Sequence, residues 1–408
     1  MVRFFNKTVL LTLVMVLIFS VLSFNASAFS KEDLDVKEQI ICVVHRGDWH
    51  SYPENSAEAV KAGQEYGIVS VDVKVTKDSK VVLMADDTTD RMVVDAEGNT
   101  VSALVAEKTE AELTSLYLRA QNGTVNKAKT DCHVANLESA LSEVAEGSVI
   151  ILNTSCADFE AVYAQVKALD AADKVIFRFN GDSNSEIIKT VSSKDDVTAI
   201  GNYQGNIIFL ATSVVKNSLA NSMNIIELGS ANGNGVLYDD YLMERFEENG
   251  KAMVSMVNGR SGKRPDSERG WDDLIAMGYS VIETDYPEQF SEYLEEVDSQ
   301  KQSLSYYVDS YKSTDLQPYT TDSEKAFVTA LTNAQSLIEN SSSLSELRNA
   351  RYELQSAYDN LTIGEKKAVT LKFDFTIGRL VAVVLCGGAI IAAQVFFFKK
   401  RDKSKKAQ

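Results

Sequence analysis

The chain has 408 residues, which is long enough for two or three domains. Hydrophobic residues make up 45% of it, enough to bury a sizeable core. The formal net charge of −17 argues against a protein that binds nucleic acid through a basic surface, so no nucleic-acid partner is expected.

Residues 1–28 have the pattern of a secretory signal peptide. Two basic residues precede an apolar run at 9–22, and Ala26-Ser27-Ala28 provides a small-x-small cleavage site. An uncleaved membrane anchor is the alternative, but the small residues favour cleavage after Ala28. The domains that follow are therefore expected outside the cytoplasm.

Polar residues lie within or directly after the first predicted strands. The expected elements are strands at 41–45, 68–75 and 81–84 and a helix at 57–67. His45-Arg46-Gly47 ends the first strand, Asp72 lies on the second, and Asp86-Asp87 follows the third. In α/β folds, functional groups gather just past the carboxyl ends of the strands.

Strands and helices continue to alternate up to residue 282. Further strands are predicted at 148–153, 174–179, 206–211, 224–228, 252–257 and 280–282, and helices at 109–118, 159–169, 238–249 and 271–277. Eight or nine strands over roughly 260 residues match a (β/α)₈ barrel, which typically takes ~250. The predicted fold is α/β, a TIM barrel at 39–297, with an open doubly wound sheet as the alternative.

Residues 300–364 predict a small helical bundle. Apolar residues recur at helical spacing on two faces, one around Phe327 and Leu331 and the other around Leu347 and Leu354. This part resembles the short helical modules of Gram-positive surface proteins (the FIVAR type). The resemblance implies a spacer, and it leaves a cell-wall or other surface partner as the alternative.

The end of the chain predicts a membrane anchor. A juxtamembrane segment at 365–379 precedes residues 380–398, which carry no charge and approach the ~20 residues that span a bilayer. The basic tail at 399–408 is expected in the cytoplasm. The expected localisation is the cell membrane, as a single-pass type I protein with an extracellular ectodomain; a buried soluble helix is the alternative.

Several motifs together resemble one enzyme family. They are His45-Arg46-Gly47, Pro53-Glu54-Asn55, Val71-Asp72-Val73 with Thr76-Lys77-Asp78, Asp86-Asp87-Thr88 with Asp90-Arg91, and the closing Thr284-Asp285-Tyr286-Pro287. In this order they resemble the glycerophosphodiester phosphodiesterases. The resemblance implies a TIM barrel of the phospholipase C-like phosphodiesterase type, and metal-dependent hydrolysis of glycerophosphodiesters in glycerophospholipid metabolism.

The family's functional residues carry over only in part. The resemblance makes His45 an acid or base, Arg46 a phosphate-binding residue and Asp72 a ligand of Ca²⁺ or Mg²⁺. Three family positions are changed, because Ser70 and Ser155 stand where metal-binding glutamates would be and Ala85 stands where the second histidine would be. The resemblance thus predicts a weakly active or inactive member, a pseudoenzyme, although whether the protein is an enzyme stays uncertain.

Several alternatives stay open. Asp86 and Asp87 either complete a shifted metal site with Asp72 or form turns, and Arg46 either binds a phosphate-bearing ligand or pairs with Glu54 or Asp72. Asp285 is expected to organise its turn rather than act on substrate. The rival functions are an active phosphodiesterase with rearranged metal ligands and a non-catalytic surface-binding module.

Overall fold

The computed structural model describes residues 40–179, 190–191, 193–204, 225–229, 252–256, 266–276 and 279–364. The predicted signal peptide at 1–28, the juxtamembrane segment at 365–379, the membrane span at 380–398 and the tail at 399–408 lie outside these ranges. Among the helices that are described, none is both long and apolar enough to cross a bilayer.

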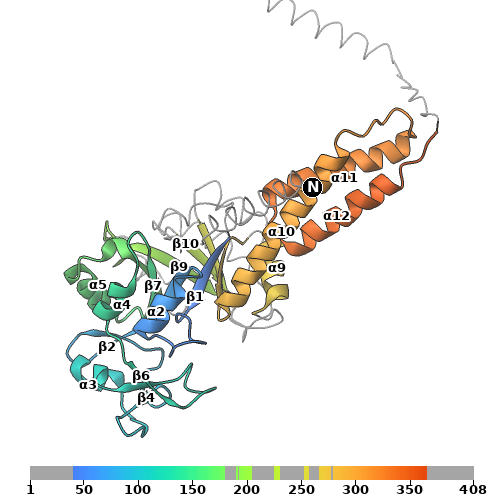
Figure 1. The fold of residues 1–408 in the computed structure, drawn as a ribbon. Helices are drawn as coiled ribbons and strands as arrows, with labels where there is room; N and C mark the ends of the chain where they lie inside the picture. Colours follow the sequence, from blue (N-terminus) through green and yellow to red (C-terminus); the bar gives the residue numbers. More distant parts are fainter. Residues whose placement is uncertain are drawn as a thin grey trace, which may run out of the picture.

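Eight parallel strands curl into a barrel (Figure 1). In spatial order they are β1 (Ile41–His45), β12 (Val281–Thr284), β11 (Ala252–Met256), β10 (Ile225–Gly229), β9 (Thr198–Gln204), β8 (Val175–Phe179), β7 (Ile150–Thr154) and β2 (Ile68–Val75). The first strand, β1, pairs with both β12 and β2, and this closes the sheet. The predicted barrel is confirmed, and the doubly wound alternative was wrong.

The barrel interior changes from apolar to polar along its axis. Alternate residues of the strands form a buried interior cluster at the amino ends: Ile41, Val43, Ile68, Val149, Ile151, Ile176, Ile200 and Val281. Nearer the carboxyl ends the buried residues are polar or charged: Ser70, Asp72, Asn153, Arg178, Glu227 and Glu283. Because side chains alternate along a strand, the intervening residues face outward and pack under the helices.

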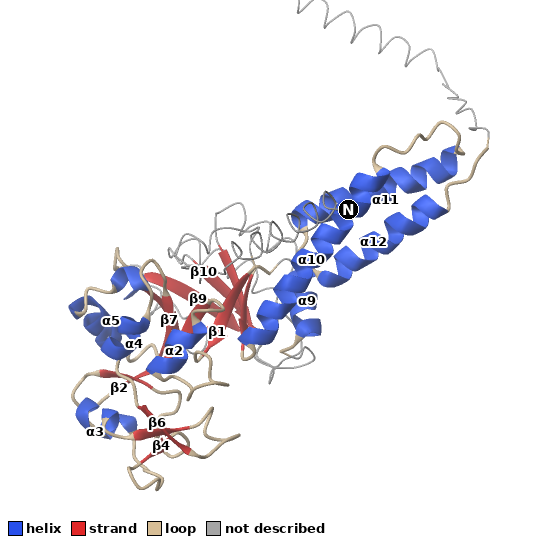
Figure 2. Ribbon diagram, in the orientation of Figure 1, coloured by secondary structure: helices blue, strands red, loops and turns tan. Residues whose placement is uncertain are grey.

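Helices cover the outside of the barrel (Figure 2). The described ones are α2 (Ala57–Gly63), α4 (Leu137–Glu143), α5 (Phe159–Ala168) and α9 (Glu268–Ala276). Helix α2 begins at Ser56, whose side chain accepts a hydrogen bond from the backbone N–H of Ala59. The turn that follows it needs glycine, because a Cβ on Gly67 would lie 2.1 Å from the carbonyl oxygen of Cys42 on β1.

A second, small sheet was not predicted. It consists of β4 (Val93–Val94), β5 (Tyr117–Arg119) and β6 (Lys129–His133), and it lies with α3 (Glu110–Thr114) beside the barrel strands (Figure 1). The antiparallel strand β3 (Val81–Leu83) pairs with β2 and leads into this region. The helix predicted at 109–118 ends at Thr114, because the chain then enters β5.

Three helices project away from the barrel (Figure 1): α10 (Pro287–Tyr311), α11 (Thr321–Asn340) and α12 (Leu344–Asp359). Helix α10 starts directly after the last barrel strand and continues into the bundle, so the boundary predicted between 297 and 300 falls within it. The rings of Tyr311 and Tyr358 stack 4.0 Å apart and join α10 to α12.

One barrel strand was not predicted. It is β9 at Thr198–Gln204, the fifth barrel strand along the chain. The strand predicted at 206–211 lies outside the described residues. The predicted helix at 238–249 also lies outside the described residues. The other predicted barrel strands overlap the observed ones.

Candidate functional site

His45 and Asp285 form a pair at the mouth of the barrel. The Nδ1 atom of His45 lies 2.8 Å from Oδ1 of Asp285, and the indole N–H of Trp49 donates to the same oxygen at 3.1 Å. His45 ends β1 and Asp285 follows β12, and these two strands are neighbours. The expectation that Asp285 only organises its turn was therefore incomplete, since its carboxylate also orients the imidazole.

Folding favours the charged form of both His45 and Asp285. Burial by itself would lower the pKa of His45, but Glu283 and the hydrogen bond to Asp285 outweigh it, so that pKa is raised. Burial would raise the pKa of Asp285, but the contact with His45 lowers it overall. An oriented imidazolium beside a carboxylate can donate a proton to a ligand, as a general acid does.

Arg46 is held in a left-handed turn between two carboxylates. Arg46 and Gly47 have φ angles of +62° and +73°, and this turn directs the arginine across the barrel mouth. Its Nη1 lies 3.1 Å from Oε2 of Glu54, and its Nε lies 2.8 Å from Oδ2 of Asp72. The predicted pairing with Glu54 or Asp72 is thus present with both, and most of the positive charge of Arg46 is neutralised.

The ion pairs continue around the rim. Glu54 also accepts a hydrogen bond from Nη2 of Arg91 at 2.5 Å, and Nε of Arg91 donates to Asp86 at 2.6 Å. Nζ of Lys74 donates to Asp87 at 2.5 Å. Asp86 and Asp87 are therefore paired with separate cations, Arg91 and Lys74, whereas Asp72 faces Arg46.

Asp72 is surrounded by nitrogen donors. Asn153 donates to Oδ1 of Asp72 at 3.2 Å, and the side-chain amide of Asn55 donates to Oδ2 at 3.5 Å. Burial would raise the pKa of Asp72, but Arg46, His45 and the two amides outweigh it and lower that pKa. The carboxylate is thus stabilised by protein groups in its charged form.

These residues do not fit the divalent metal that the family resemblance implies. Ca²⁺ takes six to eight oxygen ligands, and protein Mg²⁺ sites also rely on carboxylates. Within the described ranges, no three His, Cys, Asp or Glu side chains gather closely enough to hold a metal ion. Asp72 faces a guanidinium and two amides instead of further carboxylates.

Two of the three changed family positions have other partners. The hydroxyl of Ser70 donates to Glu283 at 2.6 Å. Ser155 lies just past β7, where its hydroxyl donates to Asp158 at 2.7 Å, and the residue beside Asp72 on that strand is Asn153. Ala85 supplies no group for proton transfer.

A buried charged cluster below the mouth was missed. Arg178 on β8 contacts Glu227 on β10 and Glu283 on β12. Each of these residues stands alone inside an apolar strand, in Val-Ile-Phe-Arg-Phe, Ile-Ile-Glu-Leu and Val-Ile-Glu-Thr. A single charge within such a run is the signal that could have identified them, because a fully buried charge requires a partner.

Aromatic side chains flank the His45–Asp285 pair. The ring of His50 stacks on Trp49 at 3.9 Å and on Tyr286 at 5.1 Å, and its Nε2 lies 3.0 Å from the backbone oxygen of Asp285. His50 is exposed on this rim, so it does not replace the histidine that is missing at Ala85.

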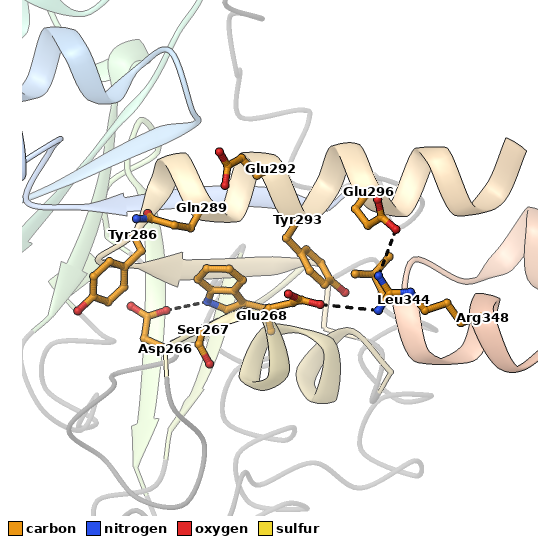
Figure 3. Close-up of a pocket in the computed structure, with 11 residues that line it drawn as sticks. Asp266, Ser267, Glu268, Tyr286, Gln289, Glu292, Tyr293, Glu296, Leu344 and Arg348 are labelled. Atoms are coloured by element: carbon orange, nitrogen blue, oxygen red, sulfur yellow. Dashed lines mark hydrogen bonds and ion pairs between the residues drawn. The ribbon is translucent and has the colours of Figure 1, made fainter. Parts of the chain in front are cut away.

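A pocket lies where the barrel meets the bundle (Figure 3). Its volume is about 480 Å³, and it begins at Tyr286, the residue next to Asp285. Asp266 at one end accepts hydrogen bonds from the backbone N–H of Asp285 and from the indole of Trp271. Its walls are Asp266, Ser267, Glu268, Trp271, Tyr286, Gln289, Glu292, Tyr293, Glu296, Leu344 and Arg348.

The chain matches one family model. A family model described as the glycerophosphoryl diester phosphodiesterase family matches residues 45–289. No curated protein sequence matches the chain.

Several solved structures match part of the chain. A glycerophosphodiester phosphodiesterase from Agrobacterium tumefaciens is 16% identical, with 62% of this chain and 100% of that chain covered at a TM-score of 0.47. The Parabacteroides distasonis glycerophosphoryl diester phosphodiesterase is 18% identical, with coverage of 65% and 91% and a TM-score of 0.49. An Oleispira antarctica phosphodiesterase in complex with its product sn-glycerol-3-phosphate is 15% identical, with coverage of 62% and 95% and a TM-score of 0.47.

The family model spans more than half of the chain, from His45 at the barrel mouth to the start of α10. The chain belongs to the glycerophosphoryl diester phosphodiesterase family.

Proposed function

We propose that this protein is a membrane-anchored, extracytoplasmic member of its family in which metal-dependent hydrolysis is weak or lost. The observation that carries the proposal is the environment of Asp72, whose carboxylate is bound by Arg46, Asn55 and Asn153. A metal ion would have to displace these nitrogen donors, and within the described part of the chain no three His, Cys, Asp or Glu side chains gather to replace them.

The remaining groups supply only part of the chemistry. Hydrolysis of a phosphodiester requires stabilisation of the phosphoryl oxygens, a proton for the leaving alkoxide and removal of a proton from water. The His45–Asp285 pair provides one proton-transfer group, and losing the other costs ~10²–10⁴-fold in rate. Nη1 and Nε of Arg46 already face Glu54 and Asp72, so much of its positive charge is compensated before any phosphate binds.

The anchoring part of the proposal rests on sequence patterns alone. The apolar run at 9–22 with its small-x-small site and the uncharged segment at 380–398 with its basic tail support export and a single membrane span. Extraction of membranes at alkaline pH tests this, since a chain that ends at residue 379 should be released and the whole chain retained.

A hydrolysis assay tests the loss of activity. Release of glycerol 3-phosphate from glycerophosphocholine and glycerophosphoglycerol is measured in Mg²⁺, Ca²⁺ or EDTA, with His45→Asn as the matched variant. We expect release by the wild-type protein to equal that of His45→Asn or to exceed it only slightly in all three conditions. Strong metal-dependent release that His45→Asn abolishes would show an active enzyme, and its loss with Asp86→Ala or Asp87→Ala would identify rearranged ligands.

A second candidate function, a non-catalytic surface-binding module, is favoured by the pocket between barrel and bundle. Four carboxylates line it, those of Asp266, Glu268, Glu292 and Glu296, against a single arginine, Arg348, which pairs with Glu268 and Glu296. The exposed ring of Tyr286 lies at the end next to Asp266 (Figure 3). Carboxylates next to an aromatic face suit a cationic ammonium group.

Titration with choline followed by protein NMR tests this candidate. Shifts of signals from the pocket should saturate, disappear in Tyr286→Ala and persist in His45→Asn, which leaves the pocket intact. Shifts that do not saturate, or that survive in Tyr286→Ala, would count against the binding module.

A further inference from the structure

The barrel interior holds one buried guanidinium between two buried carboxylates. The side chain of Arg178 is 8% exposed, and those of Glu227 and Glu283 are 2% and 4% exposed. Nε and Nη2 of Arg178 each donate to one oxygen of Glu227 at 2.8 Å, and Nη1 donates to Glu283 at 3.0 Å. The contact with Glu227 is bidentate, the geometry that fixes a guanidinium most firmly.

This cluster connects strands that are far apart in the barrel. Arg178 lies on β8 and its two carboxylates on β10 and β12. Nη1 also donates to the side-chain oxygen of Asn153 on β7 at 3.3 Å, and Ser70 on β2 donates to Glu283. Five of the eight barrel strands therefore contribute a residue to this cluster, and Ser70 on β2 contacts Arg178 only through Glu283.

The two buried carboxylates of the cluster need the positive charge of Arg178. Two carboxylates share one guanidinium, and burial raises the pKa of Glu227 although Arg178 opposes this. Burial would lower the pKa of Arg178, but the carboxylates outweigh it, so the guanidinium stays charged. Without Arg178, the carboxylates of Glu227, Glu283 and Asp72 would lie in the interior, and among the described residues the cations nearest to them would be those at the mouth.

We propose that Arg178 acts as a built-in replacement for a metal ion, a fixed cation that neutralises Glu227 and Glu283 and holds the barrel strands together. The barrel is then complete without a divalent cation, and a latent cation site opens only when the guanidinium is removed. This inference rests on the proposed function, which leaves the barrel without a metal.

Thermal unfolding of the whole chain tests the proposal. Wild type, Arg178→Met and the triple variant Arg178→Met/Glu227→Gln/Glu283→Gln are each compared in EDTA and in millimolar CaCl₂. Breaking a buried ion pair is strongly destabilising, so Arg178→Met should lower the Tm by about 10 °C in EDTA. Ca²⁺ should restore several degrees, because it binds the folded state of this variant only. The triple variant should unfold near the wild-type temperature, and its Tm should not change when Ca²⁺ is added.

Two controls separate the possible failures. Arg348→Met also removes an arginine from two carboxylates, Glu268 and Glu296, but at the surface, and its Tm should change little with or without Ca²⁺. Arg178→Lys keeps a cation and should not respond to Ca²⁺. If Arg178→Met does not fold in EDTA, its refolding yield in CaCl₂ replaces the Tm as the readout.

The outcomes distinguish this inference from the proposed function. If Ca²⁺ stabilises the wild-type protein, the metal-free barrel of the proposed function is wrong. If neither the wild-type protein nor Arg178→Met responds to Ca²⁺, the proposed function stands and the replacement role of Arg178 is overturned.

Discussion

The imidazole of His45 and the carboxylate of Asp285 lie 2.8 Å apart, although 240 residues separate them in the chain. The contact exists because β1 and β12 are neighbours in the closed barrel, and each residue stands at the carboxyl end of its strand. The proton-transfer group that the family motif supplies is therefore still oriented, while the groups around Asp72 have changed.

The His45–Asp285 pair should make stability depend on pH. The pKa of His45 is raised by folding, so its contribution is full below the unfolded value of ~6.5 and declines as the pH rises through the folded pKa. The lowered pKa of Asp285 adds stability that is lost only as the pH falls through that pKa. Because the pair is partly screened by solvent, urea unfolding should show the wild-type protein more stable than His45→Asn by at most about 1 kcal/mol near pH 5.5. The gap should be smaller at pH 9, where His45 has lost its proton. An equal gap at both pH values would contradict this account.

Removing Arg46 should destabilise the barrel. Arg46→Met leaves Asp72 without its ion pair and leaves the buried Glu54 with only Arg91, and unpaired buried charges cost about 3 kcal/mol. Denaturant unfolding measures this loss. Lys312→Met, which breaks an exposed pair with Asp309, is the control and should change the free energy of unfolding by less than about 0.5 kcal/mol. A similar effect of both substitutions would mean that Arg46 is no more than a surface residue.

Gly47 should tolerate no side chain. Its φ of +73° is unfavourable for alanine, and a Cβ would lie 2.5 Å from the backbone C and O atoms of Ala59. Gly98 has a φ of +87° but open space around it. Gly98→Ala should therefore cost about 1 kcal/mol from backbone strain alone, and Gly47→Ala about 3 kcal/mol because helix α2 must move. Equal losses in urea unfolding would show that the close approach of α2 does not matter.

Hydrogen bonds of Asp272 should stabilise the contact between the bundle and the barrel. Its Oδ1 accepts hydrogen bonds from the hydroxyls of Tyr293 and Ser343, both at 3.0 Å, which joins α9 to α10 and to the start of α12. Asp272→Ala leaves these hydroxyls without that acceptor, so we expect a loss of about 2 kcal/mol and faster proteolysis near residue 342. Asp309→Ala on the surface of α10 is the matched control. Unchanged proteolysis in Asp272→Ala would argue that apolar packing alone holds the bundle.

Local sequence patterns predicted most of the barrel. Apolar runs such as 68–75 and 150–154 are buried on both faces in a parallel barrel, so they stand out in the sequence. The strands β4, β5 and β6 are short and partly exposed, and their residues show no such run. The strand β9 begins with Thr-Ala-Ile-Gly, a weaker apolar signal than the one at 206–211.

The site was predicted less completely than the fold. His45, Arg46 and Asp72 were found because they belong to contiguous motifs. Asp285 was known as a motif residue, but its contact with His45 depends on closure of the barrel, which no local pattern reveals. The partners of Arg178 come from two other strands, so only the assembled barrel identifies that cluster.

Calorimetric titration of CaCl₂ and MgCl₂ into the whole chain, with and without glycerol 3-phosphate, tests the central claim most directly. Because Asp72 is bound by Arg46, Asn55 and Asn153, we predict no saturable heat at millimolar metal, and the same result for Asp72→Asn. Saturable binding to the wild-type protein that Asp72→Asn abolishes would contradict the account and restore a metal-dependent phosphodiesterase.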